Sequence, residues 1–135
     1  MLIEYFKISA QIVIAFSIYN VWFLRFNKPT KFRGKNAQSM KDEFLSYGLP
    51  SYFVWIIGVL KVTLATFLLV GIIYEEFIFP ASLGMAILMA GAITMHLKVK
   101  DDIIKSLPAA IFLTLSISIA LIQWYGINNF TTLVE

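Results

Sequence analysis

Lys61 is the residue of this sequence that most clearly indicates chemistry, because it interrupts the long apolar stretch 53–74. If that stretch is a helix through a bilayer, a rise of ~1.5 Å per residue places Lys61 ~13 Å deep. A lysine at that depth costs at least ~2.5 kcal/mol and is by default a functional hypothesis. The single histidine, His96, falls near the end of another apolar stretch, 77–97. An ammonium and an imidazole at similar depth would suit an anionic or carbonyl-bearing ligand.

Two further polar residues, Ser17 and Asn20, belong to the first apolar stretch near the height of Lys61. Helical side chains lean toward the helix N-terminus, which brings Lys61 toward the level of Asn20. We therefore predict a polar cluster of Ser17, Asn20, Lys61 and His96. Two interpretations stay open. Lys61 extends to the interface while His96 binds a carbonyl or headgroup, or the cluster lines a cavity for a lipid headgroup or a quinone.

The carboxylates are absent from the centres of the apolar stretches, although the chain has eight Asp and Glu residues. No carboxylate within a span is therefore expected to pair with Lys61 at its own depth. Asp101 or Asp102 could fold back toward the cluster from the loop that follows His96. Gln11, deeper in the first stretch, is predicted to form a hydrogen bond between helices.

Several classes of chemistry are excluded by composition. The chain has no cysteine and one histidine, so thiol chemistry, iron–sulfur clusters and Cys- or His-rich metal sites are ruled out. Glycine-rich phosphate loops, HExxH and GxSxG motifs are absent. These observations predict no metal site and no nucleic-acid partner, and they favour a protein that is not itself an enzyme.

The elements that must position the cluster follow from hydropathy. Of 135 residues, 59% are hydrophobic and 14% are charged, and the mean hydropathy is +0.80, whereas soluble domains are roughly 45–50% apolar and about 25% charged. Four apolar stretches have the length of a membrane span, ~20 residues, and must be helical in lipid. They cover residues 8–24, 53–74, 77–97 and 107–125. We predict an all-α, antiparallel up-down four-helix membrane bundle that forms one domain, 1–135.

Charge asymmetry predicts the orientation. Nine of the 11 lysines and arginines lie in the loops 25–52 and 98–106, and the loop Glu75–Glu76 carries none. The positive-inside rule then places both basic loops in the cytoplasm and both termini outside it. The location predicted is a bacterial-type inner membrane.

The long loop 25–52 contains a helical pattern at 39–45. One interpretation is a short interfacial helix capped by Ser39, whose apolar face holds Met40, Phe44 and Leu45. The other interpretation is a flexible basic loop near anionic lipid.

Close packing of helices in lipid requires small residues, and the third span is the richest in them. Serine, alanine and threonine recur every four residues from Ser82 to Thr94, and two glycines lie seven residues apart. The predicted packing positions are Gly58, Ser82, Gly84, Ala86, Ala90 and Gly91. This pattern indicates a compact bundle and leaves a homo-oligomer open.

Several short motifs together resemble a known family. They are FLSYGLP at 44–50, IGVLK at 57–61, LLVG at 68–71 and GAITMHL at 91–97, followed by a proline-led fourth span. From about Phe16 to Leu121 the chain resembles the DoxX-like family of small four-helix membrane proteins. That resemblance matches family positions to Lys61 and His96 and links relatives to quinone-dependent oxidoreduction. At the end of the first span Arg25 only approximates the family's lysine.

The sequence thus favours a membrane accessory protein that holds a lipid-like or quinone-like molecule near Lys61 and His96. Two alternatives stay open: a membrane subunit of a quinone-linked oxidoreductase whose redox centre lies in another chain, or an oligomeric transporter element. Besides the lipid bilayer, the partner expected is a redox or other membrane protein.

Overall fold

The chain forms only helices and connecting loops in a computed structural model that describes the backbone of residues 1–134 and the side chains of residues 1–127. Four helices are long and apolar enough to cross a membrane, and a fifth is short; no strand occurs in residues 1–134. The helices are α1 (Leu2–Tyr19), α2 (Met40–Ser46), α3 (Tyr52–Val70), α4 (Ile78–Lys98) and α5 (Leu107–Val134). The predicted all-α membrane fold is confirmed.

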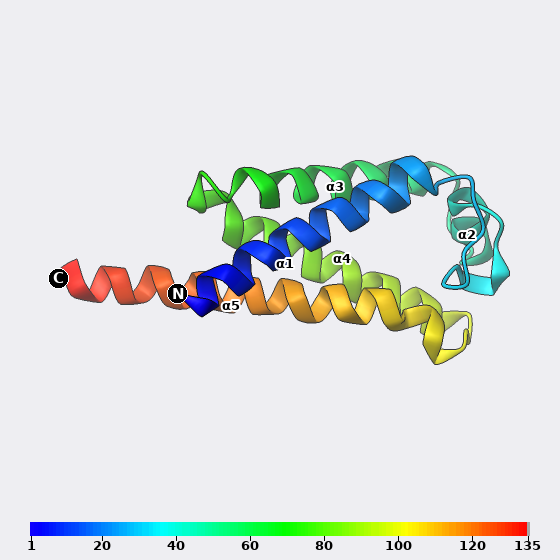
Figure 1. The fold of residues 1–135 in the computed structure, drawn as a ribbon. Coiled ribbons are helices and arrows are strands. Elements are labelled where there is room, and N and C mark those ends of the chain that lie inside the picture. The colour runs from blue at the N-terminus through cyan, green and yellow to red at the C-terminus, as the bar shows by residue number, and fades with distance from the viewer. Residues whose placement is uncertain (135) are drawn as a thin grey trace.

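The long helix α1 crosses the other three obliquely, as Figure 1 shows. Near its N-terminus it approaches α5, and toward its C-terminus it lies beside α3 (Figure 1). The short helix α2 covers the end of the bundle at which α1 finishes and α3 begins (Figure 1). The loop between α4 and α5 lies at that same end, so the two basic loops of the sequence meet there.

Three helix ends differ from the predicted spans, and one of them is that of α5, which runs to Val134 rather than ending at residue 125. The first span begins at Leu2 rather than residue 8, and it continues beyond α1 as a π-helical segment, Asn20–Leu24. The second span ends at Val70 rather than residue 74. The chain turns early there because Gly71 allows a close reversal: a Cβ on Gly71 would lie 2.6 Å from Cγ1 of Ile78.

Small residues bring the helices together at some of the predicted positions. A Cβ on Gly58 would lie 2.7 Å from the Trp22 ring, and one on Gly84 would lie 3.1 Å from Leu64. Ser82 is fully buried, and Ala86 is also buried. These four positions bring α3 and α4 into close contact with neighbouring side chains.

The other two predicted packing positions, Ala90 and Gly91, do not pack against a neighbouring helix. Ala90 is exposed, and nothing lies within 4 Å of a Cβ built on Gly91. A repeat of four residues exceeds the helical period of about 3.6 residues, so a four-residue stripe rotates gradually away from its contact. The stripe that begins at Ser82 has left the interface by Ala90, and Gly91 borders a cavity instead.

Helix α2 forms as predicted, with the Ser39 side chain accepting a hydrogen bond from the backbone N–H of Asp42 at 3.1 Å. Its apolar face differs from the prediction, because Met40 and Phe44 are buried against the bundle whereas Leu45 is 50% exposed. The buried face of α2 is therefore narrower than predicted and packs against the bundle. It makes α2 a cap on the bundle end.

Candidate functional site

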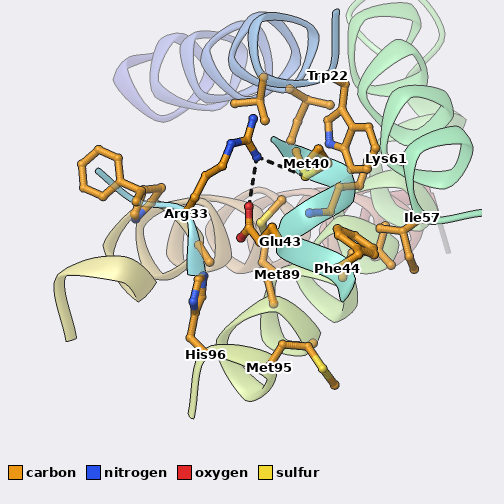
Figure 2. A pocket seen from close by; sticks show the side chains of 18 of the residues that line it. Trp22, Arg33, Met40, Glu43, Phe44, Ile57, Lys61, Met89, Met95 and His96 are labelled. Carbon is orange, nitrogen blue, oxygen red and sulfur yellow. Dashed lines mark hydrogen bonds and ion pairs between the residues drawn. The ribbon is translucent and has the colours of Figure 1, made fainter. Parts of the chain in front are cut away.

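A cavity of about 880 Å³ lies beneath α2, and residues of all five helices line it (Figure 2). Most of its wall is aromatic or aliphatic, including Trp22, Phe44, Phe53 and Phe112. The four residues of the predicted polar cluster all border this one cavity: Ser17, Asn20, Lys61 and His96. The structure thus brings them to one space, and their role in binding a ligand stays a prediction.

Lys61 extends from α3 into the cavity, beside Met40 and Phe44 of α2 (Figure 2). Its Nζ lies 5.9 Å from the ring centroid of Trp22, in a cation–π arrangement. No hydrogen-bond acceptor or carboxylate of residues 1–127 pairs with this ammonium. Among residues 1–127, the amine of Lys61 thus faces the Trp22 ring and forms no hydrogen bond or ion pair.

Arg33 organises the loop that precedes α2, and its side chain is only 3% exposed. Its Nη1 donates to Oε2 of Glu43 at 3.0 Å, and its Nε donates to the carbonyl of Lys28 at 2.8 Å. Its Nη2 donates to the carbonyl of Arg25. One guanidinium thus ties the loop to α2, which is the forked geometry that arginine provides and lysine does not.

A chain of polar contacts continues from Glu43 across the cavity wall to α4. The Tyr47 hydroxyl donates to Oε1 of Glu43 at 2.6 Å and lies 3.5 Å from Nδ1 of His96. That same Nδ1 lies 2.9 Å from Oδ2 of Asp101. Asp101 also accepts a hydrogen bond from the backbone N–H of Lys35 at 3.0 Å. Asp101, one of the two predicted candidates, therefore does fold back toward the cluster.

Burial, charge and hydrogen bonding fix the protonation states of two members of this chain, Tyr47 and Asp101. Burial raises the pKa of Tyr47 above its usual range, and the adjacent charge of Glu43 and its hydrogen bond raise it further. Burial would raise the pKa of Asp101, but its hydrogen bonds to His96 and Lys35 outweigh that effect and lower it. Tyr47 thus remains a hydroxyl donor and Asp101 a carboxylate.

Sequence reasoning missed Arg33 and Glu43 as cavity residues. Glu43 enters the cavity from α2, where its two oxygens accept hydrogen bonds from Arg33 and Tyr47, and no hydrogen bond joins it to Lys61. A usable signal was present in the sequence: Met40, Glu43, Phe44 and Tyr47 follow the helical spacing i, i+3, i+4, i+7. That spacing places Glu43 on the buried face.

At the opposite end of the bundle, Lys7 is a buried lysine that the sequence did not reveal. Its side chain is 4% exposed, and its Nζ lies 3.1 Å from Oε2 of Glu4 and 3.0 Å from Oε1 of Gln123. One turn further, Nε2 of Gln11 donates to the carbonyl of Leu68 at 2.7 Å, which confirms the predicted interhelical role of Gln11. Polar groups at this end therefore join α1 to α5 and to α3.

Comparison with known proteins gives one clear relationship. No curated protein and no solved structure matched the chain. A model of the DoxX-like family matches residues 12–119, a range that includes most of the bundle and the four residues of the predicted cluster. The chain belongs to the DoxX-like family.

Proposed function

We propose that the protein is a non-catalytic membrane protein that binds an amphipathic molecule in the cavity under α2. The polar head of that molecule contacts Lys61, and its apolar part lies along the aromatic wall. The observation that carries this proposal is an ammonium that faces a cavity of about 880 Å³ without a hydrogen-bond partner in residues 1–127.

Lys61 lies within a membrane span, where a charge is energetically unfavourable. A buried charge is unfavourable unless it is paired or hydrogen-bonded, and in a membrane span such residues mark ligand or ion sites. The Trp22 ring supplies only part of the missing interaction. A ligand with an acceptor in its head would supply the rest.

The shape of the site supports the same conclusion. Its volume lies within the ~300–1,000 Å³ of typical small-molecule sites, which combine an apolar wall with a few placed polar groups. Trp22 and Phe44 both lie close to the Lys61 side chain, and Met89 lines the same space from α4 (Figure 2). A lipid-like or a quinone-like molecule would suit such a wall, and either could enter from the bilayer.

We also propose that the end bearing α2 faces the cytoplasm of a bacterial-type inner membrane. Its two basic loops are joined by a hydrogen bond from Nζ of Lys105 to Oδ1 of Asn36 at 2.8 Å, and positive loops remain on the cytoplasmic side. A reporter that works only outside the cytoplasm should then be active when it is fused to the C-terminus. Activity of a cytoplasmic reporter at that position would reverse the proposed orientation.

The ligand can be sought by purifying the full chain in a mild detergent and analysing retained lipids and quinones by mass spectrometry. We expect the wild-type protein to retain one class of amphipathic molecule and Lys61→Met to lose most of it. Lys41→Met is the matched control, because Lys41 is exposed on α2 and does not line the cavity.

Three results would count against the proposal: wild-type protein without a retained molecule, equal retention in the wild-type and Lys61→Met proteins, or equal loss in both variants. Size-exclusion profiles of the two variants establish that they are folded before their ligand contents are compared.

A further inference from the structure

The charges that line the cavity are strongly unbalanced. Five lining residues are cationic and one is a carboxylate: Arg25, Lys31, Arg33, Lys61 and Lys105 against Glu43. Arg33 and Glu43 neutralise each other at 3.0 Å. Four positive charges therefore face the cavity without a lining carboxylate to balance them.

None of these four side chains forms a salt bridge among residues 1–127, although the Glu43 carboxylate interacts electrostatically with Lys61. Lys105 donates to the amide oxygen of Asn36 at 2.8 Å. Lys31 lies over the ring of Phe32 at 5.2 Å, and Lys61 faces an indole ring. Arg25 forms no ion pair in this part of the chain. The one lining carboxylate, Glu43, is paired with Arg33 and also accepts a hydrogen bond from Tyr47.

The four cations also differ in depth. Arg25 and Lys31 are exposed at the bundle end, Lys105 is half-buried, and Lys61 lies within the span of α3. Charges of one sign along an apolar-walled cleft concentrate the opposite ion and speed its entry. The arrangement forms a positive path that leads from the surface to Lys61.

Resting on the proposed function, we infer that the occupant is a single-chain amphiphile with an anionic head, either a carboxylate or a phosphate ester. An anion at Lys61 would offset the buried charge, which a neutral carbonyl head would do only in part. One chain is inferred because the cavity volume lies within the range of sites for a single small molecule.

The test compares probes that share one chain and differ in the head. Palmitate, hexadecyl phosphate and the neutral hexadecanol are titrated against the full chain in a nonionic detergent. We expect at least one anionic probe to bind the wild-type protein about tenfold or more tightly than hexadecanol does. The tighter of the two anionic probes identifies the head as a carboxylate or a phosphate ester.

Variants of Lys61 then test whether this residue causes the preference for an anionic head. Lys61→Met should weaken binding of the preferred anionic probe by about tenfold or more and leave binding of hexadecanol unchanged. Lys61→Arg and the control Lys41→Met should keep the preference for the anionic probe. Saturable binding of hexadecanol as tight as that of both anions would overturn this inference and leave the proposed function standing. No saturable binding of any probe would overturn both. The wild-type comparison decides the question even if Lys61→Met does not fold.

Discussion

Two lysines lie inside membrane spans at opposite ends of the bundle, and their surroundings differ. Lys7 is enclosed by Glu4 and Gln123, with both contacts near 3 Å, and joins α1 to α5. Lys61 has an indole face on one side and a cavity on the other. The end that holds Lys7 is closed, and the end that holds Lys61 is open.

This contrast separates a structural role from a binding role for the same residue type. A buried charge whose partners lie within the chain contributes to holding the helices together. A buried charge without such partners stays unfavourable until another molecule supplies them. We therefore expect changes at the two lysines to affect different properties: stability at Lys7, and ligand content at Lys61.

The largest expected effect is a loss of stability when Arg33, at the end that holds Lys61, is substituted. Arg33→Met would remove the cationic partner of Glu43 and leave that carboxylate, whose side chain is 12% exposed, without its ion pair, which should destabilise the protein by about 3–5 kcal/mol. Thermal unfolding in detergent measures this loss. Arg25→Met is the matched control, since the Arg25 side chain is exposed. Equal stability of the two variants would contradict the role assigned to Arg33.

The lysine comparison can be tested with one substitution at two sites. Lys7→Met leaves the buried Gln123 oxygen without its donor, so the free energy of unfolding should fall by about 1–3 kcal/mol. Lys61→Met breaks no hydrogen bond in residues 1–127 and should leave stability unchanged or raised. Chemical or thermal unfolding of both variants decides this. A loss at Lys61 as large as that at Lys7 would remove the distinction between the two ends.

Two glycines sharpen the same contrast between packed and open space. Gly58→Ala would press a methyl group against the buried Trp22 ring and should cost about 1 kcal/mol or more. Gly91→Ala meets nothing within 4 Å and should cost nothing. Melting temperatures of the two variants, measured in the same detergent, check this. A larger loss for Gly91→Ala would show that the space beside Gly91 is filled.

The smallest expected effect is a pH dependence at the α2 cap. The pKa of Asp101 is lowered in the folded protein and returns to about 3.9 on unfolding. Its contribution to stability is therefore present above that value and lost as the pH falls through the lower folded value. Asp101→Asn should melt below the wild type at neutral pH, and the gap should close in acid. Asp102→Asn, at an exposed neighbouring position, should show no such gap.

Much of the fold could be predicted because the signals are local. Span length and hydropathy give the four helices, and Ser39 with Asp42 gives the start of α2. Lys7 was missed because hydropathy places the span start at residue 8, whereas the pairing of Lys7 with Gln123 connects residues 116 positions apart. Such a contact depends on the oblique path of α1, which no local pattern specifies.

The candidate site was predictable in its polar residues and not in its volume. Depth along the helices brought Ser17, Asn20, Lys61 and His96 to similar heights, and all four border the cavity. The cavity itself depends on how α2 folds over the bundle end. Arg33 holds α2 there, and it is buried although it belongs to a polar loop whose sequence suggests solvent exposure.

A substitution that fills part of the cavity tests most directly whether the cavity holds a molecule. Gly91→Leu would place a side chain into the space beside the cavity without meeting the packed core, and Gly126→Leu is the matched control away from it. Mass spectrometry of the purified variants should find the retained amphiphile in the wild type and in Gly126→Leu, and its loss from Gly91→Leu. Equal retention in all three proteins would contradict the account.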